Sequence, residues 1–174
     1  MEVKFTPWRL AYVKKSDTPP EVGCVLCALH QADPAHDTEN LVLYRGRLCY
    51  VVLNLYPYNT GHLMVVPYEH TADLPALPEA TAQELFRLTR VSVALLQDEY
   101  QPHGVNVGMN IGRAAGAGID AHLHMHVVPR WNGDTNFMPL IGGVKLVPEE
   151  LNQTYARLHP RFLQWSTSVD ADVV

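Results

Sequence analysis

The chain has 174 residues, enough for a substantial core, and we expect residues 1–174 to form a single domain. Hydrophobic residues make up 47% and charged residues 18%, a balance typical of globular rather than disordered proteins. The net charge of −5 argues against broad binding to nucleic acid. No apolar run approaches the roughly 20 residues of a membrane-spanning helix, and the N-terminus lacks the apolar centre of a signal peptide, so a cytoplasmic protein without a membrane partner is expected.

The N-terminal part of the chain contains an arm and then a cysteine pair. Residues 1–20 are mixed in composition and end in Pro19-Pro20, which indicates an N-terminal arm. Cys24 and Cys27 follow in the segment GCVLCALHQ, where one or two helical turns are expected. A Cys-x-x-Cys pair has three interpretations, namely a redox pair, half of a metal site, or chance within an apolar turn. The redox interpretation requires a preceding strand, and the sequence does not predict one there.

The middle of the chain predicts an antiparallel meander followed by a long helix. Strands are expected at residues 41–44, 48–53 and 61–67, and a tight turn at 45–47 joins the first two. Thr81 and Glu84 have the spacing of a capping box, and leucines follow near helical spacing, which predicts a helix over residues 81–99.

The C-terminal half predicts two more strands and a short helix. Residues 105–111 form the fourth strand, and a glycine-rich loop at 112–121 leads to the fifth. A short helix is expected from about Pro148, and residues 166–174 are expected to be a frayed tail. The fold class is therefore α+β, with an antiparallel sheet of about five strands, one long helix and short flanking helices.

Three histidines stand at every second position in the segment HLHMHVVP, which begins at His122. Side chains alternate across a β-strand, so an extended segment places His122, His124 and His126 on one face and the apolar residues between them on the other. A half-buried strand with a histidine-rich polar face is the simplest interpretation. Neutral imidazole is also a nucleophile and a common metal ligand, so catalysis and metal binding are both open.

The histidine segment resembles the signature of the histidine triad superfamily of nucleotide hydrolases and transferases. Asn54 and the pair Gly61-His62 are similar to the superfamily's ribose-contacting asparagine and its supporting fourth histidine. The resemblance covers roughly residues 8–158 and is closest to the prokaryotic branch that cleaves dinucleoside polyphosphates such as diadenosine tetraphosphate, by phosphorolysis or hydrolysis. It implies a nucleotide substrate and a homodimer that pairs through the long helix and an adjacent strand.

The resemblance also implies a role for each histidine of the catalytic row. His124 is expected to be the nucleophile that forms a covalent nucleotidyl intermediate, His126 to donate to the phosphate or the leaving oxygen, and His62 to orient the row. Asn54 is expected at the ribose. Phosphate contacts are expected from Asn110 and from backbone N–H groups of the loop residues Gly116, Ala117 and Gly118, with Arg113 and Arg130 bringing charge nearby. The loop lacks the serine, threonine or glutamine common in the superfamily, which leaves phosphate and water open as acceptors.

Zinc-containing members of the superfamily imply a use for the cysteine pair. Their site is completed by a histidine after the third strand and by the first histidine of the triad, and those positions match His70 and His122. Cys24, Cys27, His70 and His122 are therefore expected to hold a structural zinc ion, because four sulfur and nitrogen ligands leave no open coordination position. Buried thiols without a metal are the alternative.

Three other functions compete with nucleotidyl transfer from a dinucleoside polyphosphate. A related nucleotidyl hydrolase could act on nucleoside phosphoramidates or simple nucleotides. A non-catalytic nucleotide-binding protein could retain the pocket, although the presence of His124 argues against it. A metalloenzyme could hold a catalytic metal on all three histidines of the triad.

Overall fold

The computed structural model describes residues 23–134 and 149–171, so the predicted N-terminal arm lies outside the described residues. Three α-helices are present within these ranges: α2 (Val25–Gln31), α3 (Glu79–Tyr100) and α5 (Leu151–Ala171). The strands are β1 (Val42–Arg45), β2 (Cys49–Leu53), β3 (Leu63–Pro67), β4 (Gly104–Gly108) and β5 (Met125–Arg130), and two 3₁₀ turns are η1 (Pro34–His36) and η2 (Arg113–Ala115). None of the described helices is long and apolar enough to cross a membrane.

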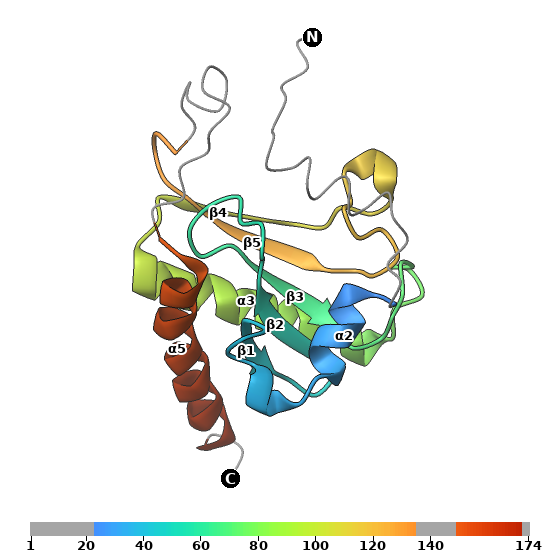
Figure 1. Ribbon diagram of the computed structural model, residues 1–174, viewed down its shortest axis with the longest axis horizontal. Helices are drawn as coiled ribbons and strands as arrows, with labels where there is room; N and C mark the ends of the chain where they lie inside the picture. The colour runs from blue at the N-terminus through green and yellow to red at the C-terminus, as the bar shows by residue number, and fades with distance from the viewer. Residues whose placement is uncertain (1–22, 135–148, 172–174) are drawn as a thin grey trace.

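The five strands form one antiparallel sheet in the order β1-β2-β3-β5-β4. The first three strands are the meander that the sequence predicts; α3 then connects β3 to the edge strand β4, and β5 lies between β3 and β4 (Figure 1). The α+β class and the five-stranded antiparallel sheet are confirmed.

The two faces of the sheet are covered by different helices because side chains alternate along each strand. One face packs against α3 and α5 and forms the larger core, which includes Leu85, Leu88 and Leu158 from these helices. The other face packs against the short helix α2, whose Leu26 is 1% exposed. In Figure 1, α2 lies in front of the strands and α3 behind them. The thinner covering by α2 leaves part of its face open.

Helix α3 begins differently from the sequence prediction. It starts at Glu79, and its N-cap Pro78 has no side-chain cap bond, so the predicted capping box is wrong. The Glu84 carboxylate instead accepts hydrogen bonds from the backbone N–H groups of Arg47 (2.9 Å) and Leu48 (2.6 Å). Glu84 is 8% exposed, and it therefore joins the helix to the turn between β1 and β2.

Helix α5 is longer than predicted. It has 21 residues, and it continues through Ala171 where we expected a frayed tail from residue 166, while residues 172–174 lie outside the described residues. Tyr155, Leu158 and Phe162 recur at helical spacing and are buried in the core, which holds the helix on the sheet. The hydroxyls of Ser166, Thr167 and Ser168 each donate to a backbone carbonyl three residues earlier. These residues, which are weak helix formers, therefore have their hydroxyls hydrogen-bonded within the helix.

The histidine segment is only partly a strand. β5 begins at Met125, so His122 and His124 precede it. The Leu123 N–H donates to the Thr71 carbonyl (2.7 Å) in the loop after β3, which removes this part of the chain from the ladder with β3. The predicted alternation is still confirmed, because Leu123 and Val127 lie in the larger core while the histidine side chains lie elsewhere.

Candidate nucleotide site and metal centre

A cavity of about 520 Å³ lies on the α2 face of the sheet. Beneath the cavity, five residues on adjacent strands are register partners and form a cross-strand row. In order across the sheet they are Val42, Val52, Met64, His126 and Gly108. Val52, Met64 and His126 line the cavity. Its apolar walls come mainly from α2, β2 and the loop after β2, and its polar groups include His124, His126, Asn40, Asn54 and Asn110. The cavity is therefore apolar along β2 and α2, carries the Asn40 carboxamide near β1, and carries imidazoles near β5.

The hydrogen bonds of His62 determine which nitrogen of His126 carries the proton. The Tyr58 backbone N–H donates to His62 Nδ1 (3.0 Å), so neutral His62 carries its proton on Nε2. His62 Nε2 lies 3.0 Å from His126 Nδ1 and donates to it. His126 therefore keeps its own proton on Nε2, as a donor. His62 itself is 1% exposed and does not line the cavity.

His124 has the opposite tautomer. Its Nδ1 lies 2.8 Å from the His122 carbonyl oxygen, which can only accept, so the proton of neutral His124 is on Nδ1. Its Nε2 consequently has a free lone pair. The rings of His124 and His126 are 4.8 Å apart between centroids and nearly perpendicular. The arrangement combines a nucleophilic nitrogen with a neighbouring N–H donor at one end of the cavity.

Burial keeps both rings neutral. It lowers the pKa of His124, with the bond to the His122 carbonyl acting in the opposite direction. Burial also lowers the pKa of His126 to about 4, and the neighbouring His124 contributes further. At neutral pH both imidazoles are therefore uncharged, which is the state that a nucleophile requires.

The loop between β4 and β5 provides fewer donors than predicted. The Gly116 N–H donates to the Arg113 carbonyl (2.9 Å) and the Ala117 N–H to the Gly112 carbonyl (3.4 Å), so both N–H groups already have acceptors within the loop, and their contact with phosphate stays a prediction. Arg113–Ala115 form η2 and Gly116 is its C-cap, so these N–H groups are hydrogen-bonded within the loop. Gly116 and Gly118 line the cavity, but Ala117 does not.

The two arginines expected near the phosphates are also engaged elsewhere. Arg113 pairs with Asp120 (2.6 Å), and Arg130 pairs with Asp134 (2.7 Å). Neither arginine lines the cavity. Asn110 does, and its side chain makes no hydrogen bond within the described part of the chain. The Asn54 carboxamide is oriented because its Oδ1 accepts from the Tyr56 N–H (2.9 Å).

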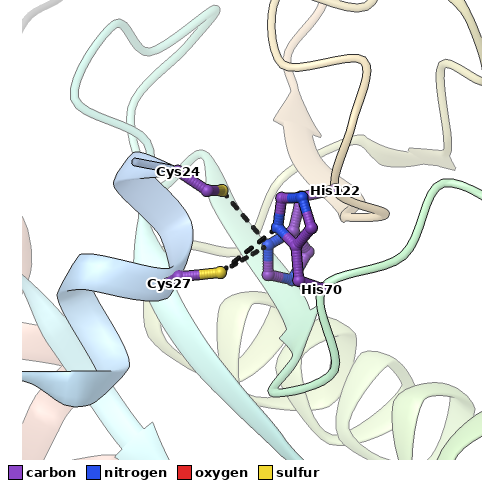
Figure 2. A group of neighbouring side chains, drawn as sticks. All are labelled: Cys24, Cys27, His70 and His122. Atoms are coloured by element: carbon purple, nitrogen blue, oxygen red, sulfur yellow. Dashed lines mark hydrogen bonds between the residues drawn. The ribbon is translucent and has the colours of Figure 1, made fainter. Parts of the chain in front are cut away.

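The four residues predicted to bind a metal come together beside this cavity. Cys24 and Cys27 project from the beginning of α2 towards His70 and His122 (Figure 2), and one ligand atom from each residue lies within 4.8 Å of the others. Cys24 Sγ is 3.3 Å from His122 Nδ1, and Cys27 Sγ is 3.5 Å from the same atom and 3.2 Å from His70 Nδ1. The predicted cluster is confirmed.

The donor set fits a tetrahedral zinc ion. Zn–S bonds of about 2.3 Å and Zn–N bonds of about 2.0–2.1 Å imply sulfur–nitrogen edges of about 3.6 Å, close to those present. Two sulfurs also converge on one nitrogen, whereas a single lone pair accepts only one S–H well. His122 Nε2 donates to the Pro67 carbonyl (2.9 Å), which leaves the Nδ1 lone pair directed at the cysteines.

Sequence reasoning missed several groups that build the site. Val52 and Met64 line the cavity below α2, and the strand register that places them there is not readable from composition. The Tyr58 N–H has no signature in the sequence. His30 is half-buried between Tyr50 and Tyr68, and its Nε2 is buried without a partner among the described residues.

Residues 35–133 match the family model described as HIT domain. The chain is 42% identical over 153 residues to a protein of Mycobacterium tuberculosis named AP-4-A phosphorylase, and the alignment covers 86% of this chain and 78% of that protein. It is 30% identical over 91 residues to the bis(5'-adenosyl)-triphosphatase of Saccharomyces cerevisiae, which is 52% of this chain and 44% of that protein.

Solved structures share the fold. A Zn-bound histidine triad family protein from Mycobacterium smegmatis superposes with a TM-score of 0.66 at 24% identity, covering 84% of this chain and 97% of that one. The diadenosine triphosphate hydrolase of Plasmodium falciparum superposes with a TM-score of 0.59 at 12% identity.

Proposed function

The chain belongs to the HIT domain family, and we propose that it transfers a nucleotidyl group from a dinucleoside polyphosphate, diadenosine tetraphosphate, to inorganic phosphate. The observation that carries this proposal is the pair of opposite tautomers at the end of the cavity, a lone pair on His124 Nε2 beside an N–H on His126 Nε2. The 42% identity to an AP-4-A phosphorylase supports the choice of substrate.

The first step forms a bond between His124 Nε2 and the α-phosphorus. The bond from that phosphorus to the bridging oxygen breaks and ATP is the leaving group. The adenylyl group is then covalently bound to His124. The His126 Nε2–H donates to a phosphate oxygen or the leaving oxygen, where negative charge develops. His62 holds His126 in the required tautomer. Asn54, Asn110 and Gly118 all line the cavity, which supports Asn54 as the ribose contact and Asn110 and Gly118 as phosphate contacts.

The second step regenerates the imidazole. A phosphate oxygen attacks the same phosphorus, the P–N bond breaks, and the product is ADP. Water in place of phosphate would produce AMP instead. The arginines and two of the loop N–H groups proposed to hold phosphate are engaged elsewhere, so the choice of phosphate rests on the relative's activity and on Asn110.

Product analysis tests this function. Diadenosine tetraphosphate is incubated with the protein, with and without inorganic phosphate, and the nucleotides are separated by anion-exchange chromatography. Phosphate should accelerate cleavage and replace AMP by ADP. If phosphate changes neither rate nor products, the enzyme is a hydrolase, and the role of His124 survives. Failure to cleave this substrate, with cleavage of an adenosine phosphoramidate, would favour the alternative nucleotidyl hydrolase.

We further propose that Cys24, Cys27, His70 and His122 hold one structural zinc ion per chain. The closed set of four donors and the fit of the distances support zinc, and the bound ion would join α2 to the loop before β5. A closed site of this kind does not supply the catalytic metal of the metalloenzyme alternative, because His124 and His126 lie outside it.

A homodimer is the proposed assembly. β4 is at the sheet edge and its residues are largely exposed, with Val107 at 45%, and Phe86 on α3 is 61% exposed. An uncovered edge strand and an exposed aromatic side chain are features that pairing with a second copy would bury. Light scattering should therefore give twice the chain mass of 19.5 kDa.

A further inference from the structure

The end of the cavity farthest from the histidines carries a carboxamide with no partner. Asn40 lines the cavity and is half-buried, and its side chain makes no hydrogen bond within the described ranges. A carboxamide offers two donors and an acceptor, so its hydrogen-bonding capacity is directed at whatever occupies the cavity. Glu39, also on the cavity wall, is restrained by a bond of 2.8 Å between its Oε2 and His36 Nδ1.

Strand order places Asn40 opposite the reacting groups. The Leu53 N–H donates to the Leu41 carbonyl (3.0 Å), so Asn40 lies just beyond the start of β1. β1 is three strands away from β5 in the sheet. At about 4.8 Å per strand, Asn40 is roughly 14 Å from the position of His126. This separation is comparable to the length of a nucleoside monophosphate that extends from the histidines towards β1.

The wall between these ends is apolar. Val52 and Met64 line it from the sheet, and Val25 and Leu29 line it from α2. If a base stacked between these side chains, only the donors and acceptors on its polar edge would need hydrogen-bond partners. That edge would face Asn40.

The backbone next to Asn40 is constrained. Leu41 has a φ of 60°, a left-handed conformation that costs a leucine free energy, and its side chain is 7% exposed. The buried Leu41 side chain and the bond from Leu53 hold this conformation. Strain of this kind next to a cavity is common where a binding group must be aimed.

We infer that Asn40 determines base specificity by pairing with the adenine edge, an inference that rests on the proposed function. Its carboxamide oxygen accepts from the 6-amino group and its NH₂ donates to the adjacent ring nitrogen, the pairing that asparagine makes with adenine elsewhere. The neighbouring Glu39 carboxylate can only accept, so it favours an amino group over a carbonyl at this edge.

The test is a cycle of binding measurements by calorimetry. AMP is compared with purine riboside 5'-monophosphate, in which hydrogen replaces the 6-amino group. The proteins are the wild type, Asn40→Leu, and the control Asn152→Leu, which makes the same change at an exposed position on α5, on the opposite face of the sheet. Wild type and control should bind AMP about three- to tenfold more tightly than the analogue, as expected for one net hydrogen bond. In Asn40→Leu this ratio should fall to about one.

The outcomes separate the two proposals. A ratio that persists in Asn40→Leu, or a wild type that does not distinguish the two nucleotides, overturns the role of Asn40 and leaves nucleotidyl transfer intact. A wild type that binds neither nucleotide overturns the proposed function as well. Circular dichroism checks the fold, and Asn40→Ser replaces Asn40→Leu if the latter is misfolded.

Discussion

Replacing Cys24 with alanine tests whether the metal centre and the nucleophile are linked. Cys24 Sγ is 3.3 Å from His122 Nδ1, and the variant keeps only three of the four donors, so zinc should be lost. The backbone carbonyl of the same His122 accepts the Nδ1 proton of His124 at 2.8 Å. We therefore expect the substitution to lower stability and also to disturb the tautomer that the reaction needs.

The magnitudes follow from these contacts. A net hydrogen bond contributes about 1 kcal/mol, so loss of the fixed His122 carbonyl should lower kcat about fivefold. For a chain of this size, each 1 kcal/mol of stability shifts the unfolding midpoint by about 2–4 °C. Because a bound structural metal contributes to folding, the midpoint should fall by more than about 4 °C. Nucleotide affinity should change little, since Cys24 does not line the cavity.

Three measurements check this prediction. Elemental analysis of protein purified without added metal should find one zinc per wild-type chain and none in Cys24→Ala. Scanning calorimetry and steady-state kinetics with diadenosine tetraphosphate measure the other two effects. Cys49→Ala is the control, because Cys49 is fully buried but outside the cluster, and it should keep its zinc and its kcat. A metal-free wild type as stable as Cys24→Ala would refute the zinc site, and zinc loss with unchanged kcat would refute the link to His124.

Three further predictions concern single side chains. His124→Ala should abolish turnover and keep nucleotide affinity within a few-fold, and a His124→Ala variant with a tenth of wild-type turnover would exclude the nucleophile role. His126→Ala should lose about 10²- to 10³-fold in rate. Burial lowers the pKa of His126 from 6.5 to about 4, so between these pH values the unfolded state binds one proton more than the folded state. The free energy of unfolding should therefore fall as the pH falls from 6.5 to about 4, and it should fall less steeply in His126→Gln. Glu84→Ala should lower the free energy of unfolding in urea by about 2–4 kcal/mol, because two backbone N–H groups lose their acceptor, while the exposed Glu150→Ala should have little effect.

The strands and the histidine pattern were predictable because they depend on local periodicity. Alternation placed the histidines opposite Leu123 and Val127, and the spacing after Cys24 indicated a helical turn. The family resemblance supplied His70 as a partner for a cysteine 43 residues away, a pairing that local patterns alone do not reveal.

Features that depend on long-range contacts were not predictable. Glu84 matches a capping box locally, but the backbone N–H groups of the turn between β1 and β2 compete for its carboxylate and win. The glycine-rich loop suggested available N–H donors, but η2 formed and used those of Gly116 and Ala117. The tautomers of His62 and His126 follow from a backbone donor at Tyr58, which no side-chain pattern encodes.

The cross-strand row also links correct folding to activity. β3 and β5 are joined by three register pairs, and the middle one opposes Met64 to His126. A slip of one residue would exchange the two faces of β5, sending His126 into the larger core and Met125 or Val127 to the cavity. A buried imidazole without its His62 partner would cost about 1–3 kcal/mol, so misaligned chains are both less stable and inactive. The same pairing therefore determines both the stability of the sheet and the geometry of the catalytic row, and misregistered chains would be a minor, inactive population.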